Sequence, residues 1–345
     1  GRRSGRLRVA SFPKLAEAPY LRMLHPALER KGVDLVDLPD VHAAPAAPLD
    51  AVHLHWLEYL IGADSLARSS VRAARLLWTL RRLRRFGKRV VFTAHNLRPH
   101  EPRHPRLEGP VTRAALRGAD AVIAHSGYAA RQIEDAYGEV ADLTVIPHGH
   151  FIGLYPPAGR AREETRAELG IPRAAFTYLL FGQLRRYKRV PQAIEAFTSL
   201  PDPDLRLLVA GSAWDAEVRE AVERAAGHDP RVRLMLEHVP DGRVAELHDA
   251  ADAAVLPYRQ VFSSGALLLA LSHGLPVVAP FEGTREIAAE PALESFNGDG
   301  LAPALEAVRH GDRAARAEAA RRVAERLDWD SIAARTVAVY EGRGR

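Results

Sequence analysis

The stretch "FTYLLFGQLRRYKRVPQAIEAF", residues 176–197, joins three features in a fixed order. Six mostly apolar residues predict a buried strand, Gly182 ends it, and a basic loop leads into a helical pattern that begins near Val190. Arg185 and Lys188 of this loop would lie at the carboxyl end of the strand, beside a helix N-terminus, where fixed positive charge and exposed amides favour a diphosphate. A solvated basic turn is the alternative.

The same order of strand, loop and helix recurs along the chain. Strand-like runs occupy residues 6–12, 33–39, 51–56, 89–95, 121–126 and 143–148, and then 176–182, 205–211, 232–238, 253–258 and 275–280. Helical patterns occupy residues 19–31, 66–86, 111–118 and 127–137, and then 190–199, 214–226, 241–249, 264–273 and 300–309. This alternation predicts an α/β protein of two Rossmann-like, doubly wound domains that face a central cleft.

Domain boundaries follow from the segment at 148–172, which is rich in Gly, Pro and charge and suits a connection. We predict a first domain over residues 1–155 and a second domain over residues 156–330. Residues 331–345 are predicted to form a last helix, with Asp330 as its N-cap.

The composition is that of a soluble globular protein, with 345 residues, 47% of them hydrophobic and 26% charged. No stretch approaches the roughly 20 apolar residues of a membrane span, and the basic start leads directly into a strand, so we expect a cytoplasmic protein. Because the chain has no cysteine, disulfides, thiolate metal sites and a cysteine nucleophile are excluded.

Positive charge is concentrated in one predicted helix. Residues 66–89 carry eight arginines and one lysine, and residues 65–100 contain no acid. Apolar residues recur there at helical spacing, which leaves the arginines on the other face. This face could be solvated, could lie on an anionic membrane, or could track nucleic acid, but nucleic acid is disfavoured because no recognition motif accompanies the charge.

A second motif, "FSSGALLLALSHGLPVVAP" at 262–280, places Ser263, Ser264 and Gly265 before an apolar helix. Free amides and hydroxyls at such a helix start can bind an anion. An ordinary N-cap above a core helix is the alternative.

In this order, "FGQLRRYKRVPQAIEAF", "LLVAGSA" and the second motif resemble the donor-binding half of the nucleotide-sugar glycosyltransferases of GT-B fold. "HLHWLEYL", "VFTAHNLRPHE" and "VIPHGHF" resemble the first half of a bacterial subgroup that builds exopolysaccharides and glycolipids and includes GDP-mannose-dependent beta-mannosyltransferases. The resemblance spans about residues 7 to 340. It implies that the first domain is the acceptor side, that the second binds the donor, and that a final helix crosses back to the first domain.

The resemblance also implies a set of donor-binding residues. Lys188 and Arg185, after Gly182, would hold the diphosphate, and Ser263, Ser264, Gly265 and Ala266 would support the phosphates or the ribose. His148 would contact the donor sugar or stabilise the hinge. Glu286 would lie at a helix start near the nucleotide, or would only complement the dipole of that helix.

Two departures from the family pattern bear on the mechanism. The retaining relatives carry two glutamates where this chain has Val261 and Leu269, and an arginine where it has Gln183. Their loss favours an inverting mechanism, which needs a base for the acceptor hydroxyl.

The loop "FTAHNLRPHEPRHP", residues 92–105, is the expected source of that base. It offers His95, Asn96, His100 and Glu101, of which Glu101 and His100 are the leading candidates; the alternative is that these groups only satisfy buried neighbours. Prolines between the histidines prevent a helix from placing them on one face, so we expect no metal and no other cofactor.

We therefore predict a glycosyltransferase that moves a sugar from a nucleotide diphosphate, GDP-mannose first, to a hydroxyl of a glycan, glycolipid or small-molecule acceptor. Residues 66–89 would rest on the inner face of an anionic membrane, and no nucleic acid would bind. The alternatives are an inactive nucleotide-sugar-binding module and a phosphorylase or epimerase of the same fold.

Overall fold

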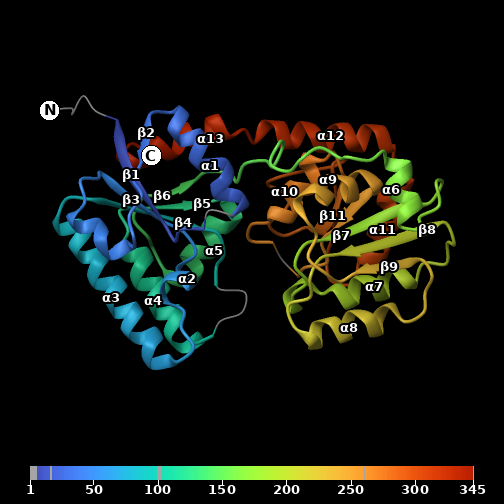
Figure 1. Ribbon diagram of the computed structural model, residues 1–345, viewed down its shortest axis with the longest axis horizontal. Helices are drawn as coiled ribbons and strands as arrows, with labels where there is room; N and C mark the ends of the chain where they lie inside the picture. Colours follow the sequence, from blue (N-terminus) through green and yellow to red (C-terminus); the bar gives the residue numbers. More distant parts are fainter. Residues whose placement is uncertain (1–5, 16–17, 99–102, 260, 345) are drawn as a thin grey trace. The chain divides into compact units, whose positions relative to one another are not determined.

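The computed structural model describes residues 6–15, 18–98, 103–259 and 261–344. The chain forms two compact units (Figure 1). Unit 1 comprises Gly1–Gly149 together with Leu327–Arg345, and unit 2 comprises His150–Arg326. Each unit contains a six-stranded sheet whose described strand pairs are all parallel. The two-unit α/β architecture agrees with the alternation of strands and helices in the sequence.

In unit 1 the strand order is β2-β1-β3-β4-β5-β6, which is the order of a doubly wound sheet. Its strands are β1 (Leu7–Phe12), β2 (Val33–Leu35), β3 (Ala51–Leu54), β4 (Arg89–Ala94), β5 (Ala121–Ala124) and β6 (Leu143–Val145). Its helices are α1 (Pro19–Arg30), η1 (Val41–Ala46), α2 (Leu57–Ile61), α3 (Leu66–Arg85), α4 (Pro105–Gly118), α5 (Gly127–Tyr137) and α13 (Trp329–Tyr340).

Helices cover both faces of this sheet. Figure 1 shows α1 and α13 on one side and α3 and α4 on the other, in agreement with the packing of α1 on α13 and of α3 on α4. The last helix begins at Trp329, and its N-cap is Asp328, whose carboxylate accepts a hydrogen bond from the Ser331 amide. The prediction of Asp330 as the cap is wrong: Asp330 lies in the first turn and pairs with Arg30 at 2.7 Å.

In unit 2 the strand order is β12-β11-β10-β7-β8-β9. Its strands are β7 (Phe176–Phe181), β8 (Leu205–Ala210), β9 (Val232–Met235), β10 (Ala253–Val255), β11 (Val277–Pro280) and β12 (Leu293–Phe296). Its helices are α6 (Arg162–Glu168), η2 (Arg186–Lys188), α7 (Val190–Thr198), α8 (Ala216–Ala226), α9 (Asp241–Ala250), α10 (Gly265–Ser272), α11 (Leu301–His310) and α12 (Arg313–Arg326). Two apolar cores, one on each face of the sheet, hold the helices in place.

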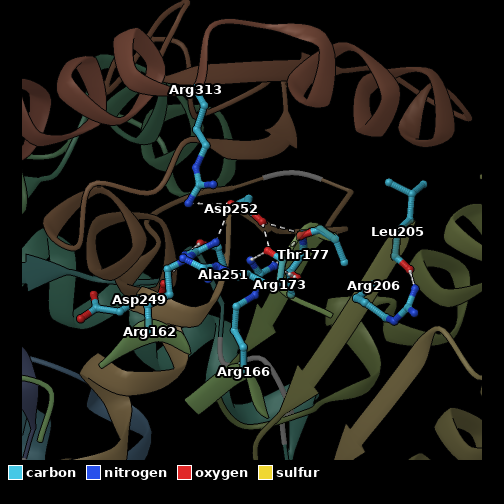
Figure 2. A network of polar contacts seen from close by, with 11 residues as sticks. Arg162, Arg166, Arg173, Thr177, Leu205, Arg206, Asp249, Ala251, Asp252 and Arg313 are labelled. Atoms are coloured by element: carbon cyan, nitrogen blue, oxygen red, sulfur yellow. Dashed lines mark hydrogen bonds and ion pairs between the residues drawn. The ribbon is translucent and has the colours of Figure 1, made fainter. Parts of the chain in front are cut away.

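A buried ion cluster fixes the amino ends of two strands of unit 2, as Figure 2 shows. Asp252, whose side chain is 1% exposed, lies just before β10 and contacts Arg162 at 2.7 Å, Arg166 at 3.3 Å and Arg313 at 2.8 Å. The same carboxylate accepts a hydrogen bond from the Thr177 amide at the start of β7. The cluster therefore ties α6 and α12 to the sheet at the end opposite the predicted diphosphate loop.

Helix α3 confirms the amphipathic pattern expected for residues 66–86. Its buried residues form one stripe, which includes Leu76, Leu80 and Leu83, and most of its arginines are exposed. Among the described residues, no helix is both long enough and apolar enough to cross a membrane.

Candidate functional site

The loop after β7 holds a buried cation. Gly182 ends the strand with φ +101°, and the loop then turns through η2, which places Lys188 underneath it. Lys188 is 8% exposed, and its Nζ lies 5.9 Å from the centre of the Tyr258 ring. Burial, and then the nearby Arg185, lower the pKa of Lys188 to about 8. No described carboxylate pairs with this amine, so an anionic ligand would supply its missing counter-charge.

A close approach of two strand ends shapes the same loop. Gly211 follows β8 with φ +143°, and a Cβ at this position would lie 2.3 Å from the Gly182 carbonyl oxygen. Glycine is therefore required at 211 by both backbone conformation and space.

Arg185, which the sequence assigns to the diphosphate together with Lys188, is held by its own neighbours. Its guanidinium donates two hydrogen bonds to Gln183 Oε1, at 2.8 and 2.9 Å, and stacks 4.0 Å above the Trp214 ring. Gln183 thus holds Arg185 in place at the end of β7. Arg186 instead pairs with Asp215 and Glu217.

The start of α10 provides the second predicted donor element. Ser264 is buried, and its hydroxyl accepts the Leu267 amide as the N-cap. Gly265 and Ala266 lie in the first turn, where backbone amides have no partner within the helix. Ser263 is half-buried beside them. The hydroxyl of Ser264 serves the helix, whereas the first-turn amides suit an anion.

Glu286 and the pair Val261 and Leu269 are the remaining residues of unit 2 for which the sequence made a prediction. Glu286 is exposed and lies in consecutive turns after β11, so the helix start expected there is absent from this described stretch. Val261 and Leu269, the two positions at which the resemblance implies glutamates in retaining enzymes, are buried apolar side chains.

In unit 1, the carboxyl ends of the strands carry a buried group of histidines. His53 lies in β3 and His55 directly follows it. His95 follows β4, and His125 follows β5. His53 contacts the Tyr340 and Thr93 hydroxyls at 2.6 and 2.7 Å, so both of its ring nitrogens have partners in the core. Burial lowers the pKa of His53 to about 3 and that of His125 to about 4, and it lowers those of His55 and His95 as well.

Three of these rings form a directional hydrogen-bond chain. His125 Nδ1 donates to the Ile146 carbonyl at 3.0 Å, so its Nε2 accepts from His95 Nδ1 at 3.3 Å. His95 Nε2 in turn accepts from His55 Nδ1 at 3.0 Å. One carbonyl therefore sets the tautomer of all three neutral rings. Because both ring nitrogens of His95 are engaged, this residue is a poor base for an acceptor hydroxyl.

His148 and Gly149 are the last residues of the first segment of unit 1, and Gly149 packs against α13. The His148 ring is buried, and its Nδ1 donates to the Gly149 carbonyl at 2.8 Å. Burial lowers the pKa of His148 to about 3. A Cβ at Gly149 would lie 2.3 Å from the Trp329 ring, so only glycine allows α13 to pack here. These contacts show how His148 stabilises the end of unit 1.

The remaining base candidates lie around the end of β4. Asn96 is half-buried and lines a small cavity together with His95 and Trp56. His100 and Glu101 lie outside the described residues. Among the residues that are described, no group of three histidines or acids has a geometry that could hold a metal ion.

The sequence analysis missed Glu108. This residue is in the first turns of α4, is 7% exposed, and lines the same small cavity as His95 and Asn96. Its Oε1 accepts the His104 amide at 2.9 Å, while its buried Oε2 has no partner among the described residues. A carboxylate within a helix pattern gives no local signal of burial, so only the fold shows it.

Two family models match the chain, one for each unit. Residues 2–150 match "Glycosyltransferase Family 4", and residues 175–325 match "Glycosyl transferases group 1". A GDP-mannose:glycolipid 4-beta-D-mannosyltransferase of Xanthomonas campestris pv. campestris is 31% identical over 282 residues, which are 81% of this chain and 74% of the relative. A D-inositol 3-phosphate glycosyltransferase of Arthrobacter is 28% identical over 86% of this chain and 71% of its own length.

Solved structures show the same fold. Sucrose-phosphate synthase from Thermosynechococcus elongatus matches with a TM-score of 0.75 at 19% identity, over 98% of this chain and 99% of that one. HepE of Anabaena, in complex with UDP and glucose, matches with a TM-score of 0.70 at 17% identity, over 97% of this chain and all of that one. The chain therefore belongs to the group 1 and family 4 glycosyltransferases, and it is a sugar-transferring enzyme of GT-B fold.

Proposed function

We propose that this enzyme transfers mannose from GDP-mannose to a hydroxyl of a lipid-linked glycan, by an inverting mechanism that needs no metal. The mannosyltransferases of Xanthomonas support the donor and the glycolipid acceptor. The observation that carries the donor site is Lys188 at the end of the strand that opens unit 2, a buried amine with no carboxylate partner among the described residues. Lys188 and the first-turn amides of α10 would offset the charge of the leaving diphosphate in place of a cation.

The side chains at the two positions that hold glutamates in retaining enzymes support the inverting part of this proposal. Val261 and Leu269 are buried apolar side chains, so neither can act on the donor as a carboxylate would. Glu101 is our first choice of base, and His100 the second. His95 is reassigned from base to a fixed, neutral neighbour of that loop, because its two ring nitrogens are engaged by His55 and His125.

The donor site can be tested by labelling, because Lys188 is the only lysine between residues 89 and 345. A lysine-selective acylating reagent at pH 8 should modify Lys188 in the free protein, as mass spectrometry would show. Bound GDP should protect it more than UDP, ADP or dTDP does. Lysines 14, 31 and 88 serve as internal controls whose labelling should not respond to nucleotide. Equal labelling of Lys188 with and without every nucleotide would remove the donor assignment.

Transfer itself is the second measurement. Incubation with GDP-mannose and a lipid-linked glycan should release GDP and extend the glycan by one sugar. Binding of GDP without turnover would favour the inactive binding module, and release of a sugar phosphate would favour a phosphorylase. The anomeric configuration of the product, read by NMR, decides between inversion and retention.

The exposed face of α3 supports a membrane-surface location for this reaction. Five of the six large apolar side chains exposed on the described residues, namely Tyr59, Leu66, Val71, Trp78 and Phe86, lie on the segment of α2 and α3. Arg82 stacks between Trp78 and Phe86, at 4.7 and 5.6 Å from the two ring centres. Aromatic side chains flanked by arginines are typical of helices that lie in a bilayer interface.

Vesicle sedimentation tests this surface. We expect the protein to bind vesicles that contain phosphatidylglycerol, to bind neutral phosphatidylcholine vesicles less, and to dissociate at high salt. Trp78→Ser combined with Phe86→Ser, or Arg81→Gln combined with Arg85→Gln, should weaken binding. Arg106→Gln on α4 is the matched control. Binding that these α3 changes leave intact would contradict the assignment.

A further inference from the structure

A groove between α4 and α5 in unit 1 has no role in the site described so far. It has a volume of about 650 Å3. Its walls combine apolar surface from Pro105, Pro110, Ala114 and Ala136 with the exposed arginines of the same two-helix surface. This mixture suits a ligand with both a sugar-like or apolar face and a negative charge.

Three arginines, Arg98, Arg113 and Arg117, line this groove. None of them forms an ion pair with a described residue, although Arg113 donates to the Ala136 carbonyl at 3.1 Å. The Tyr137 hydroxyl, which lines the groove with Arg98, donates to the Leu97 carbonyl at 2.5 Å. Burial raises the pKa of Tyr137. The groove thus has positive charges that lack counter-ions within the described part of the chain.

Glu108 connects this groove to the loop after β4. It lines both the groove and the smaller cavity whose wall includes His95 and Asn96. Its Oε1 is fixed by the His104 amide, and its Oε2 is buried without a described partner. Because this oxygen is buried away from the groove, Glu108 shapes the wall between the two hollows and is not itself a ligand contact.

We propose that the groove between α4 and α5 binds a hydroxylated anionic ligand, a sugar that carries a phosphate or a carboxylate. The anionic group lies among Arg98, Arg113 and Arg117, and the sugar lies against the apolar wall that includes Pro105, Pro110 and Ala114. The identity of this ligand as the acceptor rests on the proposed function, whereas the binding of an anionic sugar does not.

The test is a titration of the protein with sugar anions in the absence of donor. Binding is measured by isothermal calorimetry or by ligand-observed NMR. Glucose 1-phosphate and glucuronate are the two anionic probes, with glucose and inorganic phosphate as controls. We expect at least one anionic sugar to bind more tightly than either control, and the one that binds identifies phosphate or carboxylate as the recognised group. Inorganic phosphate that binds as well as glucose 1-phosphate would mean an adventitious ion only and would overturn the proposal.

Matched variants locate the binding. Arg113→Gln combined with Arg117→Gln should lower affinity at least about tenfold, because two charge-assisted hydrogen bonds are lost. Arg106→Gln, on α4 but outside the groove, should leave the affinity unchanged.

Two controls separate the possible failures. Thermal unfolding of each variant verifies that it folds, and Arg117→Gln alone replaces the double variant if that one is unstable. GDP binding to unit 2 is measured in parallel. Normal GDP binding with no response to any sugar anion would overturn the groove assignment and leave the proposed function standing. Loss of affinity in Arg106→Gln equal to that of the double variant would also overturn it.

Discussion

Lys188 lies directly under Gly182: a Cβ added at Gly182 would stand 3.3 Å from Lys188 Nζ. The glycine also has φ +101°, a conformation that other residues rarely adopt. A side chain at residue 182 would therefore strain the backbone and crowd the buried amine. The backbone conformation at the end of β7 therefore determines where the amine that we propose for diphosphate binding lies.

Gly182→Ala should weaken GDP binding and lower stability by roughly 1–3 kcal/mol, because it strains the backbone and displaces the amine. Urea unfolding and a GDP titration by thermal shift measure the two effects. Gly242→Ala is the control, since its Cβ would meet no atom within 4 Å in α9 and its φ is not positive. That change should stabilise slightly, by about 0.5–1 kcal/mol. Gly182→Ala with unchanged GDP affinity would show that the amine does not contact the diphosphate.

Lys188 should also make GDP binding depend on pH. Its folded-state pKa is about 8 against 10.5 in the unfolded chain, so the free protein loses the charge as pH rises through 8. Affinity for GDP should decrease above pH 8, and binding near that pH should take up a proton, which calorimetry in buffers of different ionisation enthalpy detects. Because the unfolded chain binds the proton more tightly, stability without ligand should rise between pH 8 and 10.5.

Lys188→Arg is the informative comparison, because arginine keeps its charge across this range. In this variant the decrease in GDP affinity between pH 7.5 and 9 should be absent. The same decrease above pH 8 in Lys188→Arg would assign the titration to another group.

The buried histidines predict acid sensitivity of unit 1. The pKa is about 4 for His125 and about 3 for His53 and His148, against 6.5 in the unfolded chain. Below pH 6.5 the unfolded state takes up protons that the folded state does not bind, so stability should fall from pH 6.5 down to those values. The free energy of unfolding, measured with urea at pH 5 to 7, should change with pH by an amount that corresponds to the uptake of more than one proton on unfolding. His125→Asn should reduce this pH dependence. A slope that His125→Asn leaves unchanged would contradict this origin.

Asp252→Asn should destabilise unit 2 strongly, by roughly 3–5 kcal/mol, because it leaves buried arginines without their counter-charge. Arg313→Gln is the matched control: its side chain is 57% exposed, and its loss should cost less than about 1 kcal/mol. Denaturant unfolding compares the two. Equal losses of unfolding free energy in the two variants would mean that the exposed ion pair, and not the buried carboxylate, provides the stabilisation.

Local pattern was enough to predict most elements. The six strands of unit 1 and the order strand, Gly182, basic loop, α7 in unit 2 follow from runs and turns of a few residues. Short or atypical elements were missed, among them β12, whose four residues include Glu294 and Ser295, and the first turns of α4, which begin at Pro105. Proline at the first helical position is compatible with a helix, although the same residue argues against one elsewhere.

The candidate site could be predicted only where one segment carries it. Lys188, Ser264 and Gly265 each sit in a continuous motif, so their place near a strand end was visible from sequence. The chain of His55, His95 and His125 joins the ends of three strands, and its tautomers depend on a carbonyl from a fourth segment. Such contacts depend on the order of strands in the sheet, which residue spacing does not encode.

The last helix completes unit 1 only after the whole of unit 2 has passed, because α13 spans Trp329–Tyr340 and unit 2 ends at Arg326. During synthesis the ribosome therefore releases every residue of unit 2 before the first unit can bury Trp329 and Tyr340 in its core. Until then the core of unit 1 is incomplete, and the surface of α1 that α13 later covers is exposed to solvent and to chaperones. Unit 2, in contrast, is an uninterrupted segment and can fold as it emerges.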